Sequence, residues 1–258
     1  MGLWSLNLEQ FESFLFVFFR VAAIFFFAPL LGSAQVPARL KVGLSLVFAL
    51  AIFPLVPAGS LPQPKGLLEL AIFLFSDVTI GLAIAYAVRL IFAAVQVAGT
   101  VVDFQMGFGV VNVIDPQTQS QVSITAQFHN ILAVLLFLAL NGHHYLVAAV
   151  VQSFQIINPY QVDFSSFTPE LILRMFSVTF TLAVKIAAPI MAVLFFLSVG
   201  LGMVARTVPQ MNVFIVGFPL QIGVGLFMIG LAMPFFATVL HNQIKEIPSL
   251  FMALMQTF

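Results

Sequence analysis

Long apolar segments, separated by short polar or proline-containing breaks, run through this 258-residue chain. A helix needs about 20 mostly apolar residues to cross a bilayer. Segments of this kind cover residues 11–31, 37–54, 67–98, 124–140, 169–206 and 212–243, and a shorter helix is predicted over 145–157. The pattern therefore predicts an all-α integral membrane protein with about six long, Pro/Gly-kinked apolar helices arranged as hairpins.

Proline marks the turns between the predicted helices. Val36-Pro37 and Val208-Pro209 are typical of turns, and Thr168-Pro169-Glu170 is typical of a helix start, because threonine caps a helix and proline is permitted in its first turn. Prolines inside the later helices predict kinks: Pro189, Pro219 and Pro234.

One segment breaks the apolar pattern. Residues 99–121 contain Asp103, the breakers Gly107, Gly109 and Pro116, and a polar run that begins at Asp115. We expect a structured loop here. The chain is then a single domain, residues 1–258, with N-terminal helices over about 1–98, this loop over 99–121, and C-terminal helical hairpins over 122–258.

Composition supports a membrane location. Hydrophobic residues make up 62% and charged residues 7%, whereas soluble proteins carry about 45–50% and about 25%. This balance disfavours a cytosolic enzyme, a nucleic-acid-binding protein and a disordered protein. The chain has no cysteine, which excludes disulfides and cysteine-ligated metals.

Isolated charges interrupt the apolar segments at Arg20, Asp77, Arg89 and Lys185. A lone charge at the bilayer centre costs about 2.5–3.5 kcal/mol, and none of the four has an opposite charge three or four residues away on its own helix. Each is expected to contact another helix, another subunit or water, or to reach the membrane surface from a helix end. The candidate polar positions between subunits are Arg20, Asp77, Arg89, Asp103, Lys185 and Arg206.

Small residues recur at four-residue spacing in the segment 183–202. Ala183 with Ala187, Ala188 with Ala192, and Ser198 with Gly202 follow this pattern. Small side chains let helix backbones approach closely. The pattern fits packing within the chain and packing between subunits equally, and Ala183, Ala187 and Gly202 are its candidate contact positions.

The chain has no recognisable catalytic, cofactor or metal motif. Gly107-Phe108-Gly109 lacks the third glycine of a dinucleotide-binding fingerprint. His143 and His144 are adjacent, so they point to different faces of a helix, and a position at the membrane surface is expected for them. We therefore predict that the protein is not an enzyme and binds no cofactor.

Two segments together resemble a known family. Gly99 to Gly109, followed by Asp115-Pro116 and a polar run to Gln127-Phe128, resembles the central motif of FliR-type proteins, which are subunits of the flagellar type III export gate with counterparts in injectisomes. The second segment resembles the family at Ala188-Pro189, Leu197 to Gly202, Arg206 to Asn212, and Gly217 to Pro219. The run from Pro209 to Asn212 favours the flagellar branch.

The resemblance implies a partner set and a location. FliR-type subunits join FliP- and FliQ-type subunits in a hetero-oligomeric assembly at the flagellar basal body in the bacterial inner membrane, and FlhB-type proteins dock on its outside. Unfolded flagellar export substrates pass through it. Contact with lipid is expected, and no nucleic acid is involved.

The same resemblance suggests that the loop closes the channel. Its candidate residues are Met106, Gly107, Phe108, Gly109, Val110, Val111, Asn112, Asp115 and Pro116. Apolar side chains close pores by excluding water, the glycines allow rearrangement, and Asp103 and Asp115 hold the ends. An ordinary connection between two helices is the alternative for this loop. For the whole chain, the alternative is a small secondary transporter with a polar site between broken helices.

Overall fold

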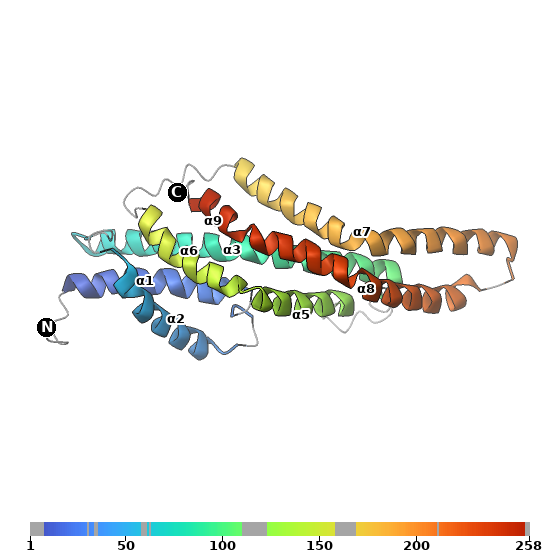
Figure 1. Cartoon of the computed structure of the whole chain (residues 1–258), viewed down its shortest axis with the longest axis horizontal. Coiled ribbons are helices and arrows are strands. Elements are labelled where there is room, and N and C mark those ends of the chain that lie inside the picture. The colour runs from blue at the N-terminus through green and yellow to red at the C-terminus, as the bar shows by residue number, and fades with distance from the viewer. Residues whose placement is uncertain are drawn as a thin grey trace. The chain divides into compact units, whose positions relative to one another are not determined.

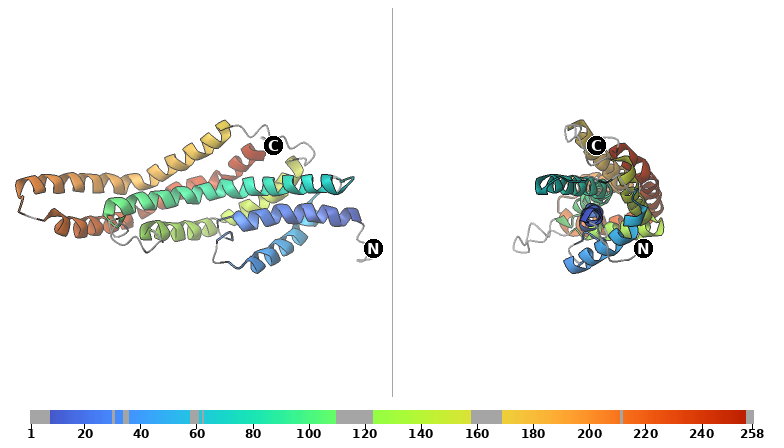
Figure 2. Two further views of the ribbon diagram at one scale, coloured as in Figure 1. Left: turned by 180° about the vertical axis from the view of Figure 1, so that it is seen from behind. Right: turned by 90° about the vertical axis from the view of Figure 1, so that its left-hand side faces the viewer.

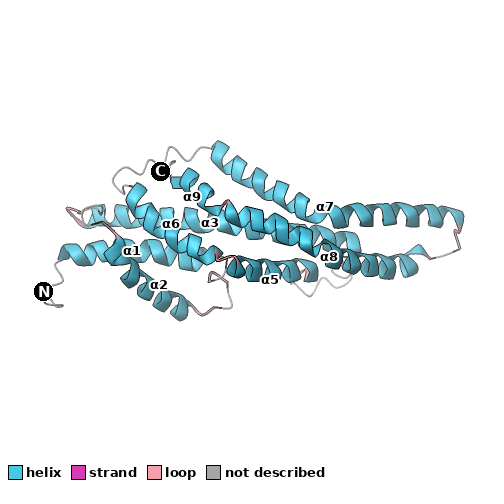
Figure 3. Cartoon of the chain, viewed as in Figure 1, coloured by secondary structure: helices cyan, strands magenta, loops and turns pink. Residues whose placement is uncertain are grey.

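The computed structural model describes residues 8–29, 31–33, 36–57, 61, 63–109, 123–157, 169–210 and 212–255, and in this part of the chain it contains helices and no strand (Figures 1 and 3). The helices are α1 (Leu8–Phe27), α2 (Ala38–Ile52), the short 3-10 helix η1 (Phe53–Leu55), α3 (Leu67–Met106), α5 (Ile124–Ala139), α6 (Gly142–Ile156), α7 (Pro169–Thr207), α8 (Val213–Lys245) and α9 (Ile247–Met255).

The predicted all-α membrane protein with about six long apolar helices is confirmed. Five helical segments are long and apolar enough to cross a membrane, and α5 with α6 would make a sixth, broken span. The break lies at Asn141, which adopts the left-handed conformation with φ of 56°. Asparagine tolerates that conformation better than most residues.

Helix α3 is longer than its sequence predicted. Gly99 and the breakers after it indicated a loop over 99–121, but α3 continues without interruption to Met106. The prediction is wrong for residues 99–106, because Gly99 serves close packing against another helix and the glycine that ends the helix is Gly107.

The described residues fall into two compact units. Unit 1 consists of Met1–Leu90, Asn141–Met175 and Lys245–Phe258, and unit 2 of Ile91–Leu140 and Phe176–Ile244. Helix α3 contributes to both units, so neither unit is a continuous piece of sequence.

Unit 1 is built around α1 and the first part of α3, which run side by side (Figures 1 and 2). Phe16 of α1 meets Phe73 of α3 edge to face, with ring centroids 6.4 Å apart. Helices α1 and α2 contact each other, as do α6 and α9. The core consists of apolar side chains from these helices: Phe16, Val17, Val21, Ile80, Ile84, Val150, Phe154 and Phe251.

Unit 2 contains the last part of α3, α5, most of α7, and α8. Helices α7 and α8 form a hairpin (Figure 1), with a turn at Pro209 as predicted. Both helices continue through their internal prolines. The core is formed by apolar residues of all four helices: Phe92, Val102, Met106, Ala133, Phe137, Leu182, Ile190, Leu194, Phe236 and Leu240.

Candidate functional site

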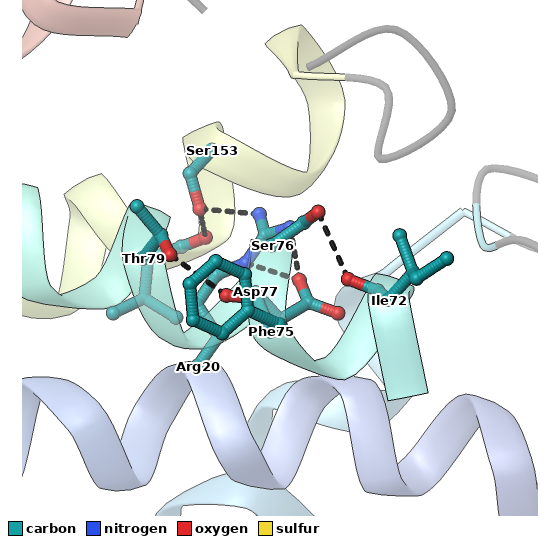
Figure 4. A network of polar contacts seen from close by, with 8 residues as sticks. Arg20, Ile72, Phe75, Ser76, Asp77, Thr79 and Ser153 are labelled. Carbon is teal, nitrogen blue, oxygen red and sulfur yellow. Dashed lines mark hydrogen bonds and ion pairs between the residues drawn. The ribbon is translucent and has the colours of Figure 1, made fainter. Parts of the chain in front are cut away.

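Arg20 lies at the centre of a polar network in unit 1, shown in Figure 4. Its Nε donates to Asp77 Oδ1 over 2.8 Å, and its Nη2 donates to the same oxygen and completes an ion pair. Its Nη1 donates to Ser153 Oγ over 2.9 Å. The network therefore joins α1, α3 and α6.

Burial makes this network costly to disturb. Arg20, Asp77 and Ser153 are each 0% exposed. The Phe154 ring lies 3.8 Å from the Arg20 guanidinium carbon, which allows a cation–π contact. Because an unpaired buried charge is strongly destabilising, two of the four isolated charges, Arg20 and Asp77, stabilise each other within the chain.

A glycine allows α1 and α3 to come close beside this pair. A Cβ added to Gly81, one helical turn after Asp77, would lie 2.6 Å from the backbone oxygen of Arg20. Any larger residue at this position would push the helices apart. No role was predicted for Gly81 or Ser153, although a small residue beside an intramembrane charge is a usable signal for close helix packing.

The end of α3, in unit 2, is a glycine-capped helix terminus. Gly107 has φ of 91°, its backbone N–H donates to the Phe104 oxygen over 3.1 Å, and the Phe108 N–H donates to the Asp103 oxygen over 3.2 Å. These two bonds are the Schellman pattern, which requires a left-handed residue at the position that Gly107 occupies. The predicted hinge glycine Gly107 is therefore the helix stop.

Asp103, in the last turn of α3, binds the start of α5. Thr125 donates its hydroxyl to Asp103 Oδ1 over 2.5 Å, and the Thr125 backbone N–H lies 3.4 Å from the same oxygen. Ser123 Oγ accepts from the Ala126 N–H over 3.0 Å. A carboxylate at a helix N-terminus is favoured by the exposed N–H groups there.

Close backbone packing reinforces this connection. A Cβ on Gly99 would lie 2.3 Å from the Ala126 Cα, so α3 and α5 touch through their main chains. A Cβ on Gly225 of α8 would lie 2.6 Å from Met106 Cγ of α3. A Cβ on Gly107, directly after α3, would lie 2.6 Å from the Phe218 ring of α8. Each glycine thus makes room for a large side chain.

The predicted loop is described only at its beginning. Met106 is 0% exposed, Phe108 is half-buried, and Gly109 lies against the ring of Phe104. Val110, Val111, Asn112, Asp115 and Pro116 lie outside the described residues. The contacts above hold residues 99–109 and 123–126, which are the described residues on either side of 110–122.

The other predicted polar and packing positions separate into buried and exposed groups. Ala183 and Ala187 are buried inside unit 2. Arg89, Lys185, Arg206 and Gly202 are exposed in the chain. Among the predicted residues, the structure brings Arg20 and Asp77 together. It also joins the predicted Asp103 to Thr125, for which no role was predicted.

Histidines among the described residues make local contacts. No cluster of three or more histidine, aspartate or glutamate residues could hold a metal ion within them. The rings of His143 and His144 lie 4.3 Å apart, and His129 donates from Nδ1 to its own helix, at the Thr125 oxygen. The functional features found here are helix-joining contacts.

Comparison with known proteins adds the family. Residues 11–247 match the family described as bacterial export proteins, family 1. The chain is 38% identical over 240 residues to the flagellar biosynthetic protein FliR of Bacillus subtilis, with 91% of each chain covered. It is 32% identical to FliR of Escherichia coli over 93% of this chain and 92% of that protein. It is 28% identical to the surface presentation of antigens protein SpaR of Shigella sonnei over 83% and 82%.

Proposed function

The chain belongs to family 1 of the bacterial export proteins, and from this premise we propose that it forms, with FliP- and FliQ-type proteins, the channel through which unfolded flagellar proteins cross the bacterial inner membrane. It is a membrane-embedded FliR-type protein and a subunit of the flagellar and type III export apparatus. Family membership replaces the alternative of a small secondary transporter. An FlhB-type protein is proposed as a further partner.

We propose that the segment Met106–Pro116 closes this channel. One observation carries the proposal: the chain before the segment is joined to the chain after it in unit 2, through the Asp103–Thr125 hydrogen bond and the Gly99–Ala126 contact. A closing segment needs fixed ends, because a free end would let it drift out of the channel. Apolar residues such as Phe108 suit a seal that excludes water.

As a structural component of a transport apparatus, the protein needs no catalytic centre of its own. We propose that energy for transport comes from other components or from the proton gradient. Asp115, at the far end of the segment, is proposed to help hold it closed.

Deletion of residues 107–112 tests the closing segment. With these residues removed, and with the Asp103–Thr125 connection left in place, the assembled channel should conduct ions when it ought to be closed. The measurement is single-channel conductance of the purified assembly in a planar bilayer. An unchanged closed-state conductance would show that the segment is an ordinary connection.

Co-expression tests the assembly. The tagged chain, produced with FliP- and FliQ-type proteins, should purify as a discrete hetero-oligomer with a fixed number of copies in native mass spectrometry. A folded chain that purifies alone in the presence of both partners would contradict the proposal.

A further inference from the structure

One face of α7 in unit 2 is exposed, largely apolar, and carries a single cation. Its members are exposed and recur every three or four residues along the helix: Thr181, Val184, Lys185, Ala188, Ala192 and Phe195. We call them the Lys185 face. Val184 is 60% exposed and Phe195 58% exposed. The opposite side of the helix supplies core residues such as Ile186 and Ile190.

Lipid alone cannot cover the whole length of α7. Its apolar window, Met175–Thr207, has 33 residues and therefore extends ~50 Å at ~1.5 Å per residue. The hydrocarbon core is about 30 Å thick. Even at a tilt of about 40°, the upper end of the usual range, the window still spans ~38 Å. Part of its exposed apolar surface must be covered by something other than lipid.

The position of Lys185 indicates which part of α7 is covered by something other than lipid. Lys185 lies ten residues, ~15 Å, from the amino end of the window. If that end is in the bilayer, a lone cation lies in hydrocarbon. If that end is outside, Phe180 and Val184, each 60% exposed, face water. A protein partner over this stretch removes both problems.

The side chains around Lys185 suit an approaching helix. Thr181, Ala188 and Ala192 are small, and larger Phe180 and Phe195 lie beyond them along the helix. Small residues let a second helix come close. Such contact removes water from the Lys185 ammonium, which forms no ion pair with any described residue, so the partner has to provide the compensating charge.

We propose that the Lys185 face binds an apolar helix of another membrane subunit of the export apparatus, and that this helix carries an aspartate or glutamate opposite Lys185. The proposal rests on the proposed function, since it requires the chain to work in an assembly with other membrane subunits. It specifies which face of the chain makes one of those contacts and the chemistry of the residue that meets it.

A crosslinking experiment distinguishes a protein from lipid on this face. Because the chain has no cysteine, Ala188→Cys provides a unique thiol for a photoreactive maleimide in native membranes. Illumination should join the chain to another membrane subunit. The matched variant Ala183→Cys, on the buried side of α7, should give no such product. Adducts with lipid alone at position 188 would overturn the proposal.

Charge reversal tests the carboxylate. In the bacterium that encodes the chain, Lys185→Glu should reduce flagellin secretion and co-purification with the other subunits at least tenfold, since two carboxylates would then face each other. Lys245→Glu, the same change at the exposed end of α8, should leave both unchanged. Motile revertants of Lys185→Glu should replace an acidic residue by lysine or arginine in an apolar helix of another subunit.

Failure of the Lys185 interface can be distinguished from failure of the proposed function. If the unaltered chain assembles with its partners but both Lys185→Glu and Lys185→Leu secrete and assemble normally, the Lys185 face is not a charged interface and only this inference is lost. If Lys185→Glu does not accumulate, the crosslink at position 188 still decides the occupant. If the unaltered chain forms no assembly, the proposed function fails first.

Discussion

Helix α3 carries two buried aspartates whose surroundings differ. Asp77, in unit 1, meets the guanidinium of Arg20, and both residues are 0% exposed. Asp103, in unit 2, is 5% exposed and accepts from the hydroxyl and the backbone N–H of Thr125, in the first turn of α5. One carboxylate is held by a full charge, the other by dipoles.

This difference predicts that the connection at Asp77 is harder to break than the connection at Asp103. Parting Arg20 from Asp77 would leave two unpaired charges inside unit 1, whereas parting Asp103 from Thr125 breaks two hydrogen bonds to one carboxylate at a helix end. The contacts around the end of α3 resemble those of Asp103: they are hydrogen bonds and close contacts at glycines, without an ion pair among the described residues. The contacts at the end of α3 should therefore break before the charge pair of unit 1 does.

The largest effect is expected from breaking the charge pair on one side only. Arg20→Leu or Asp77→Leu leaves the other charge buried and unpaired, which costs about 3–5 kcal/mol. Each variant should be nearly absent from membranes when measured by quantitative immunoblotting. The double variant Arg20→Leu/Asp77→Leu should recover most of the lost protein, because a buried pair can be replaced by apolar residues at little cost.

If the double variant were as scarce in membranes as the single variants, the pair would do more than neutralise charge. Lys41→Leu provides a comparison with another buried cation, one that donates to the Ser33 backbone oxygen instead of a carboxylate. Its loss leaves no charge unpaired, so its effect should be the smaller.

The second effect is expected at Asp103. Thr125→Val keeps the shape of the side chain but removes the donor to a buried carboxylate, and hydrogen bonds to charged groups contribute about 1.5–3 kcal/mol. Thr125→Ser retains the hydroxyl and should behave like the original. The measurement is the thermal unfolding midpoint of the purified assembly, together with its closed-state conductance.

If Thr125→Val lowered stability as much as Arg20→Leu, the distinction between the two aspartates would be lost. If it raised closed-state conductance without a large change in stability, the distinction would gain a functional meaning.

Much of the fold was predictable because apolar run length and proline position are local properties. The run from Pro169 predicted α7 to within one residue at its end, observed as Thr207. The extent of α3 was not predictable in this way. Gly99 resembles a helix breaker in sequence, and only the presence of Ala126 against it shows why a glycine lies inside a helix.

The candidate site was predicted in part. The unusual charges Arg20 and Asp77 were identifiable because charge is rare in apolar helices, but their pairing across 57 positions depends on tertiary structure. Ser153 and Thr125 gave no signal, since single hydroxyl residues are common in helices. The special backbone of Gly107 could have been read as a helix stop from its place after the last apolar residues of α3.

The third prediction concerns the backbone contact at Gly99. Gly99→Ala would place a methyl group 2.3 Å from the Ala126 Cα, so α3 and α5 would have to separate, at a cost of about 1–3 kcal/mol. Gly43→Ala, in helix α2 with nothing within 4 Å of the new methyl, should be neutral or stabilising by up to about 1 kcal/mol. Thermal unfolding of the two assemblies measures the difference. Equal midpoints would mean that α3 and α5 separate without cost.

The smallest effect is expected at Gly107, where the backbone conformation itself is at issue. With φ of 91°, a residue with a side chain costs about 1–2 kcal/mol in the left-handed region. Asparagine tolerates this region better than valine does, so Gly107→Asn should lose less stability than Gly107→Val. Both new side chains also meet the Phe218 ring, and Phe218→Ala should relieve that part in the double variants. If Phe218→Ala restored the stability of Gly107→Val completely, the whole cost of the valine would be its contact with the Phe218 ring of α8, and the backbone conformation of Gly107 would contribute nothing.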